Sequence, residues 1–237
     1  IASAGEKAEI VVRARDKQSH KGKPGGKQCN SRYSNYSCFY TRTTGIWQTV
    51  WMEPVSQIHL ARNKITPDVA NYRFLLEQPI TNNRNGTRLR VTLKDDIGVV
   101  ARRTEKADKD FTPLVDLPIP SDRAKFWSPE SPFIYDLEIE LLDCEGEVID
   151  YAESYAGLRS ITVDGKAVRL NSKKIFQRLV LDQGYYPEGI MTAPDDESLK
   201  RDIELGIEAG FNGARLHQKV FEERFLYHCD KLGYLVW

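Results

Sequence analysis

The sequence has no excess of charge of either sign. Its 237 residues contain 34 Lys and Arg and 34 Asp and Glu, so the formal net charge is zero. Proteins that bind nucleic acid or anionic membrane surfaces usually carry a clear basic excess. We therefore expect neither nucleic acid nor a membrane as a partner, and a small or neutral partner fits better.

Long apolar runs are also missing. No run approaches the roughly 20 residues that a membrane-spanning helix needs, and residues 1–6 lack the basic-then-apolar layout of a signal peptide. Because residues 8–15 read as a strand already in progress, we expect the chain to begin within a longer protein. The compartment therefore stays open, as does the question of whether the chain forms a homo-oligomer.

Cysteine is sparse and has no metal-binding spacing. Cys29, Cys38, Cys144 and Cys229 are too few and too scattered for a disulfide scaffold, and no Cys-x-x-Cys pair occurs among them. Free structural thiols are the preferred interpretation, and a bond between Cys29 and Cys38 is left open for an exported protein. The sequence indicates no cofactor and no metal site.

The first 160 residues are patterned as short strands without a helix of convincing length. Residues 8–15 alternate between apolar and polar and predict a strand, residues 16–32 predict a long loop, and residues 49–52 predict another strand. Because proline cannot continue a central ladder, Pro54 indicates a domain boundary. Further strands are expected at residues 57–61, 72–77, 87–93, 98–103, 133–142 and 148–154. Their length, spacing and alternation predict an immunoglobulin-like β-sandwich.

The pattern changes after about Gly157. Strands are expected at residues 175–181, 211–216 and 234–237, with helices at residues 195–209 and 221–232 between them. Alternating strands and helices predict a parallel sheet with right-handed crossovers. Three strands cannot close an eight-stranded barrel, so we expect this unit to continue past the last residue of the sequence.

Polar residues follow two of these parallel strands. Asp182, Gln183 and Tyr185 come after the first strand, and Arg215, His217 and Gln218 come at the end of the second. Ligands of parallel α/β folds bind at the carboxyl ends of strands, and a pair of clusters at one edge favours a binding site over isolated structural contacts.

Two of these expectations concern the type of contact. For Asp182, hydrogen bonding to sugar hydroxyls is preferred over acid catalysis, and a structural cap is the remaining alternative. Tyr185 is a candidate for ligand stacking, whereas Trp47 and Trp51 are expected to fill a core.

Four segments taken in order resemble the family 2 glycoside hydrolases: residues 40–51, 126–132, 170–184 and 202–237. That family includes β-galactosidases, β-glucuronidases and β-mannosidases. The resemblance implies a multidomain β plus α/β protein with three parts. Residues 1–54 would be the end of a galactose-binding-like jelly-roll sandwich, residues 55–157 an immunoglobulin-like sandwich, and residues 158–237 the first strands of a (β/α)8 TIM barrel.

The resemblance also assigns sugar contacts. The family has an Arg at the end of its second barrel strand and a sugar-binding His shortly after, which Arg215 and His217 match, although many members carry the His where this chain has Gln218. Arg42 matches a position near the active site. Leu181, Asp182 and Gln183 stand where the family often has Asn-Arg-His, and they resemble a distinct subgroup.

The implied activity is retaining hydrolysis of O-glycosidic bonds in β-glycosides, with a β-galactosidase-like enzyme as the preferred interpretation. That chemistry needs two carboxyl groups, and in the family both glutamates would follow Trp237. We therefore expect no catalytic residue in this chain and no activity from it alone. Some family members use Mg²⁺ or Na⁺. A non-catalytic carbohydrate-binding or scaffolding remnant is the alternative, and a sandwich that binds other proteins is a third possibility.

Overall fold

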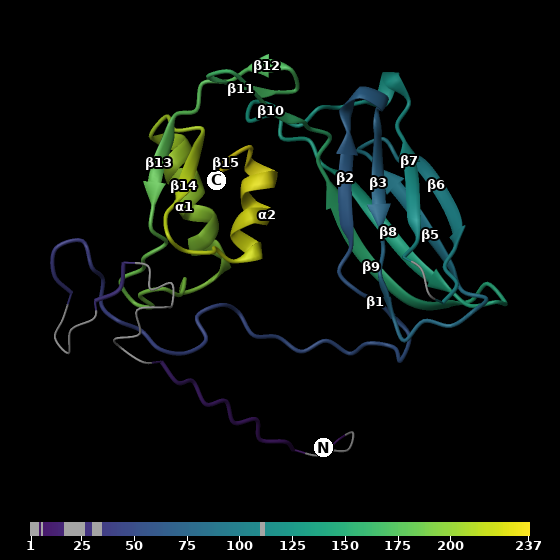
Figure 1. The fold of residues 1–237 in the computed structure, drawn as a ribbon, viewed down its shortest axis with the longest axis horizontal. Helices are drawn as coiled ribbons and strands as arrows, with labels where there is room; N and C mark the ends of the chain where they lie inside the picture. Colours follow the sequence, from purple (N-terminus) through teal and green to yellow (C-terminus); the bar gives the residue numbers. More distant parts are fainter. Residues whose placement is uncertain (1–4, 6, 17–26, 30–34, 110–111) are drawn as a thin grey trace.

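The computed structural model describes residues 5, 7–16, 27–29, 35–109 and 112–237. Strands dominate, and within these ranges no helix is long and apolar enough to cross a membrane. A β-sandwich and a smaller α/β unit lie side by side, joined at the top of Figure 1 by a small antiparallel sheet.

The sandwich consists of two antiparallel sheets packed face to face (Figure 1). One sheet has the strand order β6-β5-β8-β9, the other has the order β2-β3-β7, and a short ladder pairs β1 with β4. The strands are β1 (His59–Leu60), β2 (Lys64–Asp68), β3 (Arg73–Glu77), β4 (Ile80–Thr81), β5 (Arg88–Lys94), β6 (Val99–Lys106), β7 (Leu114–Pro118), β8 (Tyr135–Leu142) and β9 (Val148–Ala156).

Alternation along β5 decides which side chains enter the core. Leu89 and Val91 are fully buried, and they pair in register with Leu141 and Ile139 of β8. These side chains share one hydrophobic core with others from the opposite sheet, including Phe74 of β3. A period of two therefore places one face of each sheet in the core, as the sequence predicts for this region.

Two strands of the smaller sheet were not expected from the sequence. β2 contains Pro67 and β7 ends in Pro118, and proline argues against a strand in a local reading of the sequence. Both strands lie at the edges of their sheet, where the missing N–H of proline costs no ladder hydrogen bond. The local sequence pattern does not reveal where a strand lies within its sheet. For this reason neither β2 nor β7 was predicted.

A buried ion pair closes one end of the sandwich. The Asp95 side chain is completely inaccessible to solvent. It accepts hydrogen bonds from Arg123 Nε at 2.9 Å, Ile97 N at 2.9 Å and Gly98 N at 3.1 Å. The bond with Arg123 is the main reason why the pKa of Asp95 falls from 3.8 to about 2.

Replacing Asp95 with asparagine is expected to lower the free energy of unfolding by about 2–3 kcal/mol at pH 7, because bonds to a charged acceptor are lost. The pKa of Asp95 is lowered on folding, so its contribution is present above pH 3.8 and is lost as the pH falls towards 2. Urea unfolding at pH 7 and at pH 3 should therefore show a smaller difference from wild type at the lower pH. Asp122→Asn, at an exposed neighbouring site, is the control; an equal deficit for Asp95→Asn at both pH values would contradict the prediction.

The α/β unit has three parallel strands in the order β13-β14-β15. They are β13 (Leu179–Asp182), β14 (Gly213–Leu216) and β15 (Leu235–Val236), and the connecting helices are α1 (Asp196–Glu208) and α2 (Glu223–Leu232). Asp195 caps α1 by accepting a hydrogen bond from Ser198 N at 2.8 Å, and Gly233 ends α2 in the left-handed conformation. The predicted β-α-β-α-β order is confirmed, although β13 starts four residues later than predicted.

An additional antiparallel sheet precedes this unit. It consists of β10 (Ile161–Asp164), β11 (Ala167–Leu170) and β12 (Lys173–Lys174). It lies between the sandwich and the α/β unit in Figure 1.

The two strands expected before Pro54 are not present in the structure. Residues 8–15 and residues 49–52 have no regular secondary structure and form no ladder, and their apolar side chains are exposed, with Trp51 at 69% and Val11 at 81%. A segment with a strand-like sequence forms a strand only where another segment supplies backbone hydrogen bonds. No described segment pairs with either of these two stretches. The prediction that Trp51 fills a core is therefore wrong, whereas Trp47 is half-buried.

Cys38 is also exposed, and its thiol is free.

Candidate functional site

The loops that follow β13 and β14 lie next to each other. The parallel register pairs Asp182 with Leu216, and His217 N donates a hydrogen bond to Asp182 O at 2.8 Å. Parallel pairing thus brings together the two polar clusters that the sequence places after these strands. Side chains from both loops line one cavity, with a volume of about 210 Å³.

The cavity, which we call the strand-end pocket, is lined by residues of both loops and of the N-terminal segment: Lys27, Gln28, Tyr40, Trp47, Gln183, Met191, His217, Gln218, Lys219 and Val220. Three of the predicted site residues, Gln183, His217 and Gln218, are among them.

One wall of the strand-end pocket comes from the segment of residues 40–49, in which Tyr40 and Trp47 are the lining residues. Tyr40 stacks on Tyr185, with ring centroids 4.5 Å apart and an interplanar angle of 22°. Thr192 Oγ1 donates a hydrogen bond to Trp47 O at 3.0 Å, and Gln48 Nε2 donates one to Val220 O at 3.1 Å. In Figure 1 this segment passes below the α/β unit before it continues to β1. A stretch that the sequence assigns to a separate domain therefore completes the pocket.

His217 has unused hydrogen-bonding capacity in this pocket. Both of its ring nitrogens are buried, and neither bonds to any other residue that the structure describes. Burial lowers the pKa of His217, and the positive charges of Lys27 and Arg215 lower it further. A neutral imidazole has one N–H donor and one acceptor nitrogen, so His217 can both donate to a hydroxyl group and accept from one.

Asp182 stabilises the turn rather than lining the strand-end pocket. Its Oδ1 accepts a hydrogen bond from Gly184 N at 2.8 Å. Burial raises the pKa of Asp182, and the nearby Asp202 also raises it, while the Gly184 bond and the charge of Lys219 act in the opposite direction. Asp182 lines a separate, neighbouring cavity of about 390 Å³ together with Gln183 and Tyr185. This geometry fits the structural cap that the sequence left as an alternative.

The two arginines proposed from the sequence do not line the strand-end pocket. The Arg215 guanidinium lies 4.7 Å from the centre of the Trp237 ring. Arg42 forms an ion pair with Asp16. Tyr185 has one face covered by Tyr40, so a ligand can stack only on its other face.

Several lining residues were not predicted to belong to the site, and one of them, Trp47, was expected to fill a core instead. Tyr40, Trp47 and Lys219 stand in the segments that carry the family resemblance, so their presence near the site could have been inferred. Lys27 and Met191 have no local pattern that indicates a site, because their proximity depends on how distant segments pack.

The described residues contain no group of three or more His, Cys, Asp or Glu side chains placed to hold a metal ion. Among the described residues that line the strand-end pocket none is acidic, so they do not supply the two carboxyl groups that glycoside hydrolysis needs. The pocket can therefore recognise a polar ligand but does not itself supply that chemistry.

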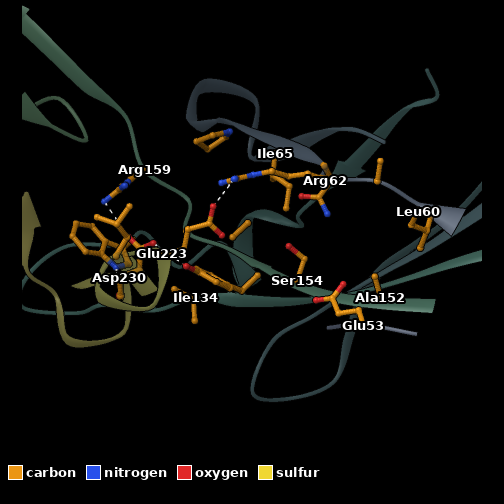
Figure 2. A pocket seen from close by; sticks show the side chains of 18 of the residues that line it. Glu53, Leu60, Arg62, Ile65, Ile134, Ala152, Ser154, Arg159, Glu223 and Asp230 are labelled. Carbon is orange, nitrogen blue, oxygen red and sulfur yellow. Dashed lines mark hydrogen bonds and ion pairs between the residues drawn. The ribbon is translucent and has the colours of Figure 1, made fainter. Parts of the chain in front are cut away.

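A larger cavity of about 790 Å³ lies between the sandwich and α2. Figure 2 shows Arg62 directed at Glu223 and Arg159 beside Asp230, the latter pair separated by 3.7 Å. Tyr155 also donates a hydrogen bond to the Asp230 carboxylate at 3.2 Å. Because these charged groups are paired with one another, the strand-end pocket is the stronger candidate for a binding site, since no described residue bonds to the ring nitrogens of His217 there.

Comparison with known proteins identifies the family. Residues 58–159, which comprise the sandwich, match the family described as Glycosyl hydrolases family 2. The chain is 31% identical over 198 residues to a "Putative beta-glucuronidase" of Formosa agariphila, an alignment that covers 81% of this chain and 24% of that protein. It is 30% identical over 118 residues to "Beta-galactosidase 2" of Enterobacter cloacae, covering 50% of this chain and 11% of the relative.

The fold is also similar to a solved structure. A family 2 glycosyl hydrolase from Bacteroides cellulosilyticus superposes with a TM-score of 0.66 and 24% identity, covering 77% of this chain and 25% of that one. The chain belongs to glycosyl hydrolase family 2, and it spans a quarter or less of the length of the relatives named here.

Proposed function

We propose that the chain is the sugar-recognition segment of a retaining β-glycosidase, and that the strand-end pocket holds part of the sugar. The observation that carries the proposal is His217: a half-buried imidazole whose two nitrogens are shielded from solvent and bond to no described residue, in a pocket between parallel strand ends of a family 2 protein. Buried polar groups are rarely left without partners. Sugar hydroxyl groups, which both donate and accept, fit this environment.

The proposed function includes the domain assignment made from the sequence. We propose that residues 1–54 belong to a jelly-roll domain, residues 55–157 to an immunoglobulin-like sandwich and residues 158–237 to the start of a (β/α)8 barrel. The parallel strands with their two helices support the last assignment. In such barrels the loops after the strands hold the substrate, which is where the strand-end pocket lies.

We propose no catalytic role for any residue of this chain. Retaining hydrolysis uses one carboxylic acid to protonate the leaving oxygen and one carboxylate as nucleophile. The family resemblance assigns both to positions that follow Trp237. The described residues would contribute binding and orientation, with His217, Gln183 and Gln218 as the hydrogen-bonding groups.

Two sugar classes are candidates for the glycone, the sugar unit on the hydrolysed side. The sequence interpretation favours a β-galactoside, in keeping with the relatives named β-galactosidases. A specific feature favours a sugar acid such as a glucuronide: Lys27 lines the strand-end pocket, and among the described residues no acidic side chain does. The charge of a lysine favours a carboxylate over a hydroxyl group.

Calorimetric titration of the 237-residue chain with methyl β-D-galactopyranoside and with methyl β-D-glucuronide tests the proposal. We expect one of them to bind, and His217→Ala to weaken that binding roughly tenfold through the loss of hydrogen bonds. His59→Ala is the control, because His59 lies on β1 of the sandwich.

Two outcomes would count against the sugar site. One is the absence of binding by either glycoside, and the other is unchanged affinity in His217→Ala. Binding accompanied by no hydrolysis in a protein that extends past Trp237 would favour the alternative, a non-catalytic carbohydrate-binding or scaffolding protein.

A further inference from the structure

The Lys219 ammonium group joins three separate segments of the chain. Its Nζ donates hydrogen bonds to Gly184 O at 2.6 Å and to Met191 O at 2.8 Å, both in the loop between β13 and α1. Lys219 itself lies in the loop between β14 and α2. The same Nζ is 5.2 Å from the centre of the Trp47 ring, in the wall formed by residues 40–49.

The Lys219 side chain is partly buried, and neighbouring groups compensate its charge. Burial lowers its pKa, while the nearby carboxylates of Asp182, Glu222 and Asp202 raise it. Removing an ammonium group from water is costly unless hydrogen bonds and charges compensate. Here two carbonyl oxygens and several aromatic faces provide that compensation, including Phe221, whose ring centre is 5.0 Å away.

Gly184 leaves room for the Lys219 side chain. A Cβ atom at position 184 would lie 2.7 Å from Lys219 Nζ and 2.7 Å from Phe221 Cζ. Gly184 also has a φ of +57°, in the left-handed region that glycine adopts most easily. The absence of a side chain is therefore what allows the ammonium group to reach the backbone of the neighbouring loop.

We infer that Lys219 is a positioning residue for sugar binding. It holds the loop after β13, the loop after β14 and residues 40–49 in the arrangement that encloses the strand-end pocket. His217 and Gln218 directly precede Lys219, and Gln183 directly precedes Gly184, so the lysine fixes the backbone beside all three pocket residues. The ligand named in this inference rests on the proposed function; the positioning of the loops does not.

Hydrogen exchange and glycoside titration of the full 237-residue chain test this role together. Lys219→Met keeps an unbranched side chain but removes the charge and the donors, whereas Lys219→Arg keeps both. Lys166→Met, at an exposed turn position, is the matched control.

In Lys219→Met we expect at least tenfold faster exchange of amides in residues 183–193 and 40–49, with unchanged exchange in the sandwich. We also expect roughly tenfold weaker binding of whichever methyl glycoside the wild type binds, because displaced contact groups lose affinity. Lys219→Arg should recover most of both losses, and Lys166→Met should behave as wild type.

Unchanged exchange in both segments of Lys219→Met would overturn the inference, as would a Lys219→Arg variant as defective as Lys219→Met. If the wild type binds neither glycoside, the proposed function fails. The exchange measurements, made without ligand, then decide the positioning role by themselves.

Discussion

Replacing Trp127 with alanine is expected to lower the free energy of unfolding by about 3–5 kcal/mol, the usual cost of removing a large buried aromatic side chain. Trp127 is 1% exposed. Its Nε1 donates a hydrogen bond to Asp230 O in α2 at 2.7 Å, and its carbonyl oxygen accepts one from Asn171 Nδ2 at 3.0 Å. The Arg159 guanidinium lies 4.6 Å from its ring centre.

These contacts place Trp127 where the sandwich, the small β10-β11-β12 sheet and α2 meet. Its loss should therefore uncouple the sandwich from the α/β unit as well as leave a cavity. Urea unfolding followed by far-UV circular dichroism measures the loss, and separate transitions for the two units are expected in place of one.

Two variants control for this prediction. Trp127→Phe keeps most of the ring and loses the indole N–H bond, so a loss of about 1–2 kcal/mol is expected. Trp51→Ala removes a tryptophan that is 69% exposed, and its effect should stay within about 0.5 kcal/mol. If Trp127→Ala were no more destabilising than Trp51→Ala, the junction would not depend on this side chain.

Replacing Gly213 with valine is expected to disrupt the parallel sheet, with a cost of about 3 kcal/mol or more, at the upper end for overpacked sites. A Cβ atom at this position would lie 2.1 Å from Leu235 O and 2.7 Å from Leu179 Cδ2. Because β14 is the central strand, neither flank can accept the added atoms unless a neighbouring strand moves.

The expected signature is local. Amides of β14 and β15 should lose protection in hydrogen exchange, and the binding of a glycoside to the strand-end pocket should fall with them, while the sandwich stays protected. Gly165→Ala is the control, because no atom lies within 4 Å of its Cβ position and only the backbone conformation at φ +59° is penalised, at about 1 kcal/mol. Retained protection of β14 in Gly213→Val would contradict the prediction, because the sheet would then accommodate the valine side chain with its hydrogen bonds intact.

The positions of most regular elements could be predicted from local patterns. Leu89, Val91 and Leu93 alternate with polar residues, and the structure buries all three. Asp195 and Gly233 mark helix ends through capping chemistry that involves only nearby backbone. Such signals depend on neighbours two to four residues away, so they are present in the sequence itself.

Pairing with distant segments could not be predicted in the same way. Residues 49–52 are a short, mostly apolar run typical of a strand, yet the part of the chain that the structure describes supplies no strand partner for them. β2 was missed for the opposite reason: its proline is tolerated because the strand lies at a sheet edge. In both cases the outcome depends on what lies beside the strand in space.

The candidate site was likewise predictable only in part from the sequence. The β-α-β order by itself determined that the residues after Leu181 and after Leu216 would meet at one edge, because parallel strands align their carboxyl ends. The tertiary structure decided which of them share a pocket: His217 and Gln183 do, whereas Arg215 lies on Trp237. It also decided that Trp47 lines the pocket beside the Lys219 ammonium group, with support from contacts such as that between Gln48 and Val220, 172 positions apart. Local sequence patterns carry no information about such contacts, since they arise only when separately formed elements pack.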